Sequence, residues 1–182
     1  MSTEAEYRQK IATYNHTHLL ELWQQILLGE TPGWQPGKAL EYLVIRSFEI
    51  EGAEVVYPYT VRVGSTIVEQ IDGVLYSDGL ACLVECKDQE ANIAIDPVAK
   101  LRNQLNRRPA GTLGIVFSTA GFTEAAVILT QYNVNQTILL WDGSDLDYAL
   151  QHQYMRRGLV RKYRYCIERG LPNYSLTIGD LS

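Results

Sequence analysis

The stretch LACLVECK, residues 80–87, decides the fold prediction for this chain. It is short and apolar until its last three residues, which is typical of a strand inside a sheet. Side chains alternate along a strand, so Leu83, Glu85 and Lys87 share one face, and the two cysteines and Val84 share the other. A carboxylate and an ammonium group on one face of a core strand are costly to bury without a purpose. Binding of a hard divalent cation would supply that purpose.

An acidic residue also interrupts the preceding apolar run, QIDGVL at residues 70–75. Asp72 and Gly73 are poor strand formers, and a glycine at such a point predicts a bend or the close approach of another segment. Taken alone, Asp72 is read equally well as a surface aspartate, and Glu85 as a salt-bridge partner of Lys87. Their joint occurrence favours one shared site.

The remaining sequence predicts alternating helices and strands. Apolar periodicity predicts helices over residues 5–29, 38–51, 96–107 and 123–132, and a short helix beginning at 145. Apolar runs between turn signals predict strands over residues 54–59, 68–76, 80–87, 113–117 and 137–141. Asp96 followed by Pro97 is typical of a helix start, and Ser77-Asp78-Gly79 predicts a tight turn between two antiparallel strands. This order predicts an α/β sandwich with a mixed central sheet flanked by helices.

Length and composition are those of an ordinary globular protein. The chain has 182 residues, of which 46% are hydrophobic and 20% charged. No apolar run approaches the roughly 20 residues that span a bilayer, and the polar, acidic N-terminus is unlike a signal peptide. Cys82, Cys86 and Cys166 lack metal-binding spacing and are expected to be small buried thiols. We therefore expect a cytoplasmic protein without membrane attachment.

Charge is unevenly distributed along the chain, whose net charge is −5. Residues 1–95 hold 6 Lys and Arg against 14 Asp and Glu, whereas residues 96–182 hold 10 against 7. Global acidity argues against nonspecific coating of nucleic acid, but the second half can form a local basic face. Its candidate phosphate contacts are Arg107, Arg108, Arg156, Arg157, Arg161 and Lys162. A basic helix that is solvated, or docked against the acidic half, is an equally weighted interpretation.

Three segments resemble, in order, the motifs of the PD-(D/E)xK nuclease superfamily, and most closely its Mrr-like branch. They are GKALE at 37–41, IDGV at 71–74 and LVECK at 83–87. The helix from Lys100 to Arg108 and the segment ILLWDG at 138–143 are similar to later elements of that branch. The resemblance implies a restriction-endonuclease-like three-layer sandwich over residues 37–150. Residues 1–30 would form an N-terminal helical extension, and residues 151–182 a basic C-terminal extension.

The resemblance also implies a metal site for Mg²⁺ or Mn²⁺. Asp72 and Glu85 would be its ligands, with help from the backbone carbonyl of Cys86. Glu41, on the helix predicted over 38–51, would be a further ligand or would position a water molecule. Mg²⁺ keeps several waters and takes one or two carboxylates together with substrate oxygens, so this donor set suits it.

The remaining implied catalytic residues are Lys87 and Gln104. Lys87 would orient or activate the attacking water and stabilise charge on the phosphate, and Gln104 would support Lys87 or the phosphate. The implied function is a Mg²⁺-dependent endodeoxyribonuclease of the restriction or defence type, acting on DNA. Two alternatives remain: a junction-resolving or repair nuclease of the same fold, and a non-catalytic nucleic-acid-binding or assembly module. No separate DNA-reading segment is evident, so target choice is expected to come from a homodimer or a partner specificity subunit.

Overall fold

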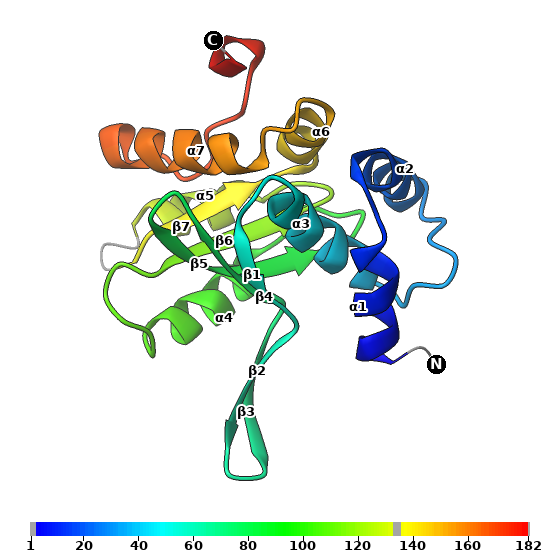
Figure 1. The fold of residues 1–182 in the computed structure, drawn as a ribbon. Helices are drawn as coiled ribbons and strands as arrows, with labels where there is room; N and C mark the ends of the chain where they lie inside the picture. Colours follow the sequence, from blue (N-terminus) through cyan, green and yellow to red (C-terminus); the bar gives the residue numbers. More distant parts are fainter. Residues whose placement is uncertain (1–2, 133–135, 182) are drawn as a thin grey trace.

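The computed structural model describes residues 3–132 and 136–181 and contains a mixed five-stranded sheet with helices on both faces (Figure 1). Its strands, in spatial order, are β1 (Glu54–Val56), β4 (Gly73–Ser77), β5 (Leu80–Lys87), β6 (Leu113–Ser118) and β7 (Ile138–Trp141). Pairing is antiparallel from β1 to β5 and parallel from β5 to β7. This arrangement confirms the predicted α/β sandwich with a mixed sheet.

Each face of the sheet has its own hydrophobic core. The larger core packs against α1 (Glu4–Ala12), α2 (His16–Leu27), α3 (Lys38–Ile50), α6 (Gly143–Gln151) and α7 (Met155–Arg169). The smaller core packs against α4 (Ile95–Leu105) and α5 (Glu124–Gln131). Along β5, Cys82, Val84 and Cys86 enter the larger core and Leu83 enters the smaller one. The alternation predicted for this strand is therefore confirmed.

A second, two-stranded sheet projects from the body of the protein. Its strands β2 (Tyr59–Val63) and β3 (Thr66–Ile71) form an antiparallel hairpin that extends away from the main sheet (Figure 1). The predictions of single strands over 54–59 and 68–76 were therefore wrong. The first breaks at Pro58, which has no N–H to donate, and the second breaks at Asp72.

Gly73, directly after the break at Asp72, lies against α3. A Cβ atom on Gly73 would meet the end of the Ile45 side chain on α3, so a larger residue here would require that side chain to move. The turn between β4 and β5 has the predicted form, with Asp78 at φ 52° and Gly79 at φ 80°. Two successive residues with positive φ match the twist of the hairpin.

Helix boundaries differ from the prediction in three places. The helix expected over 5–29 is two helices. The first ends at Ala12, and Asn15 caps the N-terminus of the second, α2. Helix α4 begins at Ile95, after Ala94, so Asp96 and Pro97 lie inside its first turn and are not its cap. The helix expected from 145 begins earlier, where Asp142 caps α6 through the backbone N–H groups of residues 144 and 145. A separate helix, α7, follows it, and a short 3-10 helix spans Ile178–Leu181.

The two ends of the chain pack onto the same core as its middle. Trp23 of α2 and Leu159 of α7 are buried in the larger core beside Leu139 of β7. The division into 1–30, 37–150 and 151–182 stays a prediction, and its outermost residues 1, 2 and 182 lie outside the described part. Among the described helices, none is long and apolar enough to cross a membrane.

A buried ion pair fastens α7 to the body. Lys162 is 0% exposed, and its Nζ donates to Asp145 Oδ2 at 2.6 Å and to the carbonyl of Leu140 at 2.8 Å. It also donates to the carbonyl of Tyr174. The other oxygen of Asp145 accepts the backbone N–H of Leu176 at 2.8 Å. One ammonium group thus joins β7, α6, α7 and the C-terminal segment.

We expect Lys162→Ala to lower the free energy of unfolding by about 3–5 kcal/mol, because it leaves the Asp145 carboxylate buried without a counter-charge. Chemical denaturation checks this value. Arg164→Gln removes an exposed cation from the same helix and is the control, expected to change stability by no more than about 0.5 kcal/mol. Equal, small effects of both substitutions would contradict a structural role for Lys162.

Candidate active site

The site begins at Asp72, where the chain passes from the projecting hairpin into the main sheet. Its Oδ2 accepts the backbone N–H of Cys86 at 2.7 Å, so the carboxylate lies against the end of β5. The backbone pairing of β4 with β5 reaches Gly73 and Val84, and the contact from Asp72 to Cys86 continues it by one step. Asp72 is therefore held beside the two charged residues at the end of β5.

Glu85 is the most deeply buried charge of the site. Its side chain is 0% exposed, and its Oε1 accepts from Lys87 Nζ at 2.5 Å. Lys100, on α4, donates to both carboxylate oxygens, at 2.9 and 2.8 Å. One carboxylate thus carries two ammonium groups from two different elements. Such pairing is what makes its burial tolerable.

Lys100 is a site residue that the sequence analysis did not select. It lies one helical turn before Gln104, which was selected, so both residues lie on the same side of α4. That spacing was the available signal. Whether this side met β5 depended on how α4 packs on the sheet, which the sequence pattern did not reveal.

Glu41 approaches the site from α3. Its Oε2 accepts from Lys38 Nζ at 2.6 Å within the first turn of the helix. The charge of Glu41 contributes to the raised pKa of Asp72, so it lies within electrostatic reach of that carboxylate. The structure therefore places Glu41, Asp72, Glu85 and Lys87 near one another, and their roles stay a prediction.

The local environment favours a neutral Asp72 and a charged Lys87. Burial, followed by repulsion from Glu85 and Glu41, raises the pKa of Asp72 to about 7. Burial alone would lower the pKa of Lys87, but its hydrogen bond and ion pair with Glu85 outweigh that effect and raise the pKa. Crowded carboxylates of this kind are stabilised by any additional cation that they bind.

The donor set suits a hard divalent cation. Among residues 3–132 and 136–181, no three His, Cys, Asp or Glu side chains group closely enough to hold a metal ion together. A site built from Asp72, Glu85 and the Cys86 carbonyl, completed by water, does not need a third side chain. The Cys86 thiol is excluded as a ligand, because burial raises its pKa well above the ordinary value and keeps it protonated.

Gln104 lies next to this cluster but has a different contact from the one predicted. It is 4% exposed, and its Nε2 donates to the carbonyl of Gln70 on β3 at 3.1 Å. Its Oε1 is buried and has no hydrogen-bond partner within the described part of the chain. Support of Lys87 or of a phosphate by Gln104 stays a prediction.

The basic residues selected from the sequence are largely engaged within the protein. Arg107 and Arg108 both pair with Glu69 on β3, the latter at 2.6 Å. Arg161 pairs with Asp180 at 2.6 Å. The prediction that Lys162 contacts nucleic acid needs correction, because its ammonium group is fully buried.

Arg156 favours the docking interpretation of the basic segment. It donates to the carbonyl of Glu51 at 2.8 Å and pairs with Asp78 at 3.0 Å, and both residues belong to the acidic half of the chain. Arg157 is exposed and lies over the ring of Tyr154, 4.9 Å from its centroid. Arg156, Arg161 and Lys162 of α7 pair with acidic residues, whereas Arg157 has no acidic partner in the described part of the chain.

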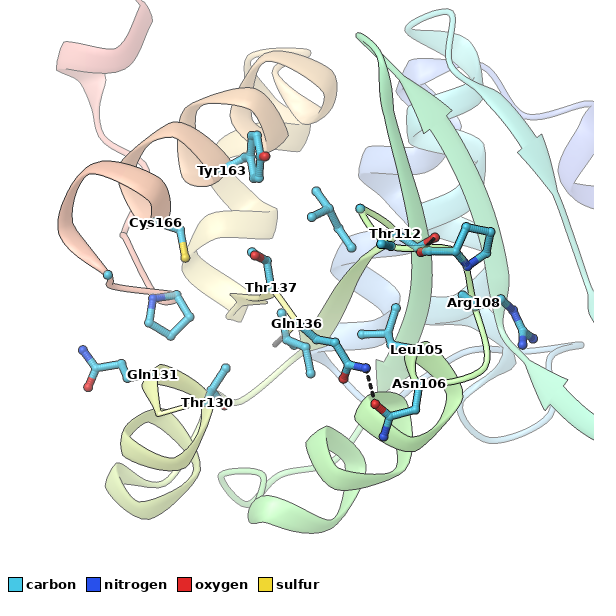
Figure 2. Close-up of a pocket in the computed structure, with 17 residues that line it drawn as sticks. Leu105, Asn106, Arg108, Thr112, Thr130, Gln131, Gln136, Thr137, Tyr163 and Cys166 are labelled. Atoms are coloured by element: carbon cyan, nitrogen blue, oxygen red, sulfur yellow. Dashed lines mark hydrogen bonds between the residues drawn. The ribbon is translucent and has the colours of Figure 1, made fainter. Parts of the chain in front are cut away.

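A separate pocket of about 470 Å³ lies at the other end of the sheet (Figure 2). It is lined by Leu113 and Ile138, the first residues of β6 and β7, and by Tyr163 and Cys166 of α7. Glu85 and Lys87 pair instead with the last residues of β6. The pocket is therefore not part of the candidate site.

Comparison with known proteins identifies one family and a group of distant folds. Residues 35–150 match the model of the Mrr_cat family, described as restriction endonuclease, which confirms the resemblance found in the motifs. No curated protein sequence matches the chain. A solved protein of unknown function, AF1548, is 18% identical over 66% of this chain and 58% of its own, with a TM-score of 0.43.

Two solved restriction endonucleases are also similar. MspJI, in complex with a 27-mer oligonucleotide, is 16% identical over 88% of this chain and 37% of its own, with a TM-score of 0.43. AspBHI, a DNA modification-dependent enzyme, is 12% identical over 94% of this chain and 43% of its own, with a TM-score of 0.39. The chain thus spans well under two thirds of the length of each of these solved chains.

The raised pKa of Asp72 predicts an unusual pH dependence of stability. The folded state holds this proton more tightly than the unfolded state, so without metal the free energy of unfolding should fall as pH rises from about 4 to about 7. Asp72→Asn keeps an acceptor for the Cys86 N–H and removes the charge. In chelator, it should be more stable than wild type near pH 8, by on the order of 1–3 kcal/mol.

Denaturant titrations at several pH values check this expectation, with the exposed Glu90→Gln as control for loss of one negative charge. The control should follow the wild-type curve. A clear loss of stability in Asp72→Asn at alkaline pH would mean that the carboxylate is a structural partner and not a strained one.

Proposed function

The chain belongs to the Mrr_cat restriction endonuclease family, and from this premise we propose that it hydrolyses phosphodiester bonds of DNA with the help of a divalent metal ion. The observation that carries the proposal is the crowding of Asp72 and the fully buried Glu85 beside Lys87 at the end of β5. A fold needs no such cluster for stability, since burial of like charges is unfavourable. The same cluster suits a reaction in which negative charge accumulates on a phosphate.

Asp72 and Glu85 would hold Mg²⁺ or Mn²⁺, together with the backbone carbonyl of Cys86. The ion would offset the charge of the scissile phosphate and make the attacking water more acidic. The hydrogen bond from the Cys86 N–H fixes one oxygen of Asp72 and so orients the other. Glu85 is held equally firmly, because two ammonium groups bond to it.

Lys87 would act on the reacting atoms from the same strand face. Its raised pKa keeps the ammonium group protonated, so it is suited to orient the attacking water and to stabilise charge on the phosphate, and not to act as a base. Glu41, on α3, would accept a hydrogen bond from a water molecule at the entrance of the site. Gln104, on the same side of α4 as Lys100, has a buried Oε1 atom without a hydrogen-bond partner in the described part of the chain, and it would support Lys87 or the phosphate.

We expect millimolar Mg²⁺ or Mn²⁺ to raise the melting temperature of the protein, with Mn²⁺ the stronger of the two on affinity grounds. Each kcal/mol of binding should raise it by about 2–4 °C for a chain of this size. Differential scanning fluorimetry measures the shift without any knowledge of the substrate. Asp72→Asn should abolish both the shift and cleavage, whereas Lys87→Ala should keep the shift and lose cleavage.

Cleavage itself is tested with supercoiled, linear, branched and single-stranded DNA, each with Mn²⁺ and with chelator. Preference for branched DNA would favour a junction-resolving nuclease of the same fold. Absence of both a metal shift and cleavage in wild type would contradict the nuclease proposal and favour a binding or assembly module. A homodimer, a specificity subunit and a cytoplasmic location stay predictions.

Lys100 allows a sharper test of the metal site. Its ammonium group bonds both oxygens of Glu85, so a cation bound by Glu85 has to share the carboxylate with it. Lys100→Met keeps the aliphatic stem and removes the charge, and it should lower the Mn²⁺ concentration at half-maximal thermal shift by about three- to tenfold. Lys100→Arg is the matched control and should stay close to wild type. Unchanged or weaker metal binding in Lys100→Met would place the metal away from Glu85.

A further inference from the structure

Helix α4 has two chemically different faces. Val98, Leu101 and Leu105 pack into the smaller core on the sheet. A polar stripe follows the neighbouring face at helical spacing with Lys100, Asn103 and Gln104, and Arg107 continues it in the turn after the helix. Part of this stripe faces solvent and part faces the projecting hairpin, which lies next to it.

The hairpin and this stripe form the two walls of an open groove. The groove has a volume of about 850 Å³, and residues 67–70 of β3 form the wall opposite α4. Glu69 fastens the walls together at one end through Arg107 and Arg108. Gln104 fastens them near the middle through the carbonyl of Gln70.

The groove leads directly to the candidate active site. Lys100 lines it and also bonds the buried Glu85 carboxylate at 2.8 Å. Arg107, two residues after the end of α4, lines the other part of the groove and has a side chain that is 55% exposed. A guanidinium group has five N–H donors, so Arg107 keeps donors for a ligand while it pairs with Glu69.

Charge and unused hydrogen-bonding capacity indicate the kind of occupant. The residues that line the groove include two cations, Lys100 and Arg107, and one carboxylate, Glu69, in a chain whose net charge is −5. The Gln104 Oε1 atom is buried without a partner in the described structure, on a residue that lines this groove. Near the tip of the hairpin, Val63, Ile67 and Val68 are between 44% and 68% exposed. A cationic, amide-rich floor beside an apolar arm is typical of a surface that follows a nucleic-acid backbone.

We infer that the groove between β3 and the polar face of α4 holds the backbone of the DNA strand that enters the active site, with the β2–β3 hairpin as an arm over the duplex. This inference rests on the proposed nuclease function and adds to it the path of the substrate. Phosphates contact Arg107 and Asn103 and then reach Lys100 beside Glu85. The apolar tip of the hairpin packs against the sugars and base edges of the adjoining groove of the duplex.

Asn103→Glu tests the inference because it adds a negative charge inside the groove. Asn103 is exposed on a helix, and its side chain makes no hydrogen bond within the described part of the chain, so the substitution should leave the fold intact. Binding of a fluorescein-labelled DNA duplex is measured by anisotropy with Ca²⁺ in place of Mg²⁺. We expect Asn103→Glu to weaken binding by about tenfold or more, because it places like charges in contact.

Gln25→Glu is the matched control. It makes the same change of charge on α2, an exposed helix position that packs on the opposite face of the sheet, and it should bind DNA like wild type. Arg107→Gln provides a second measurement: the slope of log affinity against log salt should become shallower by about 0.9, the value for one lost phosphate contact. Both groove variants should keep the thermal shift with Mn²⁺, which shows that fold and metal site are intact.

The groove and the proposed function can fail separately. Wild-type affinity of Asn103→Glu, with cleavage retained, would overturn the groove and leave the nuclease function standing. Equal weakening of DNA binding by Gln25→Glu and Asn103→Glu would also overturn the groove inference, because the loss would then not depend on the position of the added charge. If wild type shows neither DNA binding nor cleavage, the proposed function fails and the groove inference fails with it.

Discussion

The hydrogen bond from the Cys86 N–H to Asp72 is the contact on which the geometry of the site depends. At Asp72 the chain leaves a hairpin that points away from the body and enters the central sheet. The carboxylate replaces the strand pairing that is lost at that point, because it accepts an N–H that would otherwise face an open edge. Gly73 follows with no side chain at a point where a Cβ atom would meet the side chain of Ile45 on α3. Asp72 therefore has both a structural contact and a place in the candidate site.

Two buried charges in the described part of the chain, Lys162 and Glu85, have different surroundings. Around Lys162, one ammonium group satisfies Asp145 and two carbonyls, and the result is a rigid attachment between elements. Around Glu85, two ammonium groups meet one carboxylate, while neighbouring Asp72 has a pKa raised to about 7 by burial and repulsion. The first arrangement is complete within the chain. The second has carboxylates that a further cation would stabilise, which is why we assign function to it and structure to the other.

Many charges of the basic second half pair with acidic residues of the same chain. Arg156 of the basic half binds Glu51 and Asp78 of the acidic half, and Arg161 binds Asp180. The first pairs join α7 to the acidic half, and the second joins α7 to the C-terminal segment. Lys100 of α4 stays beside the active site, because that helix lies between the buried Glu85 and the projecting hairpin.

The sequence by itself determined β5, β6 and β7 to within a residue, the turn at Asp78 and the alternation along β5. It also selected four charged residues that the structure places near one another, as a candidate site. These features depend on local periodicity, on turn chemistry and on short motifs, all of which are encoded over a few neighbouring residues. The family resemblance was accessible for the same reason, since its motifs are short and ordered along the chain.

Only the tertiary structure decided the split of the two long strands at Pro58 and Asp72, the second lysine on Glu85 and the internal use of Arg156, Arg161 and Lys162. Each of these depends on contacts between residues far apart in the sequence. Lys100 reaches Glu85 because α4 packs across β5, and Lys162 is buried because α7 closes over β7. An isolated lysine in a polar helix looks the same in sequence whether it meets water, a carboxylate or a phosphate, since packing alone selects among these partners.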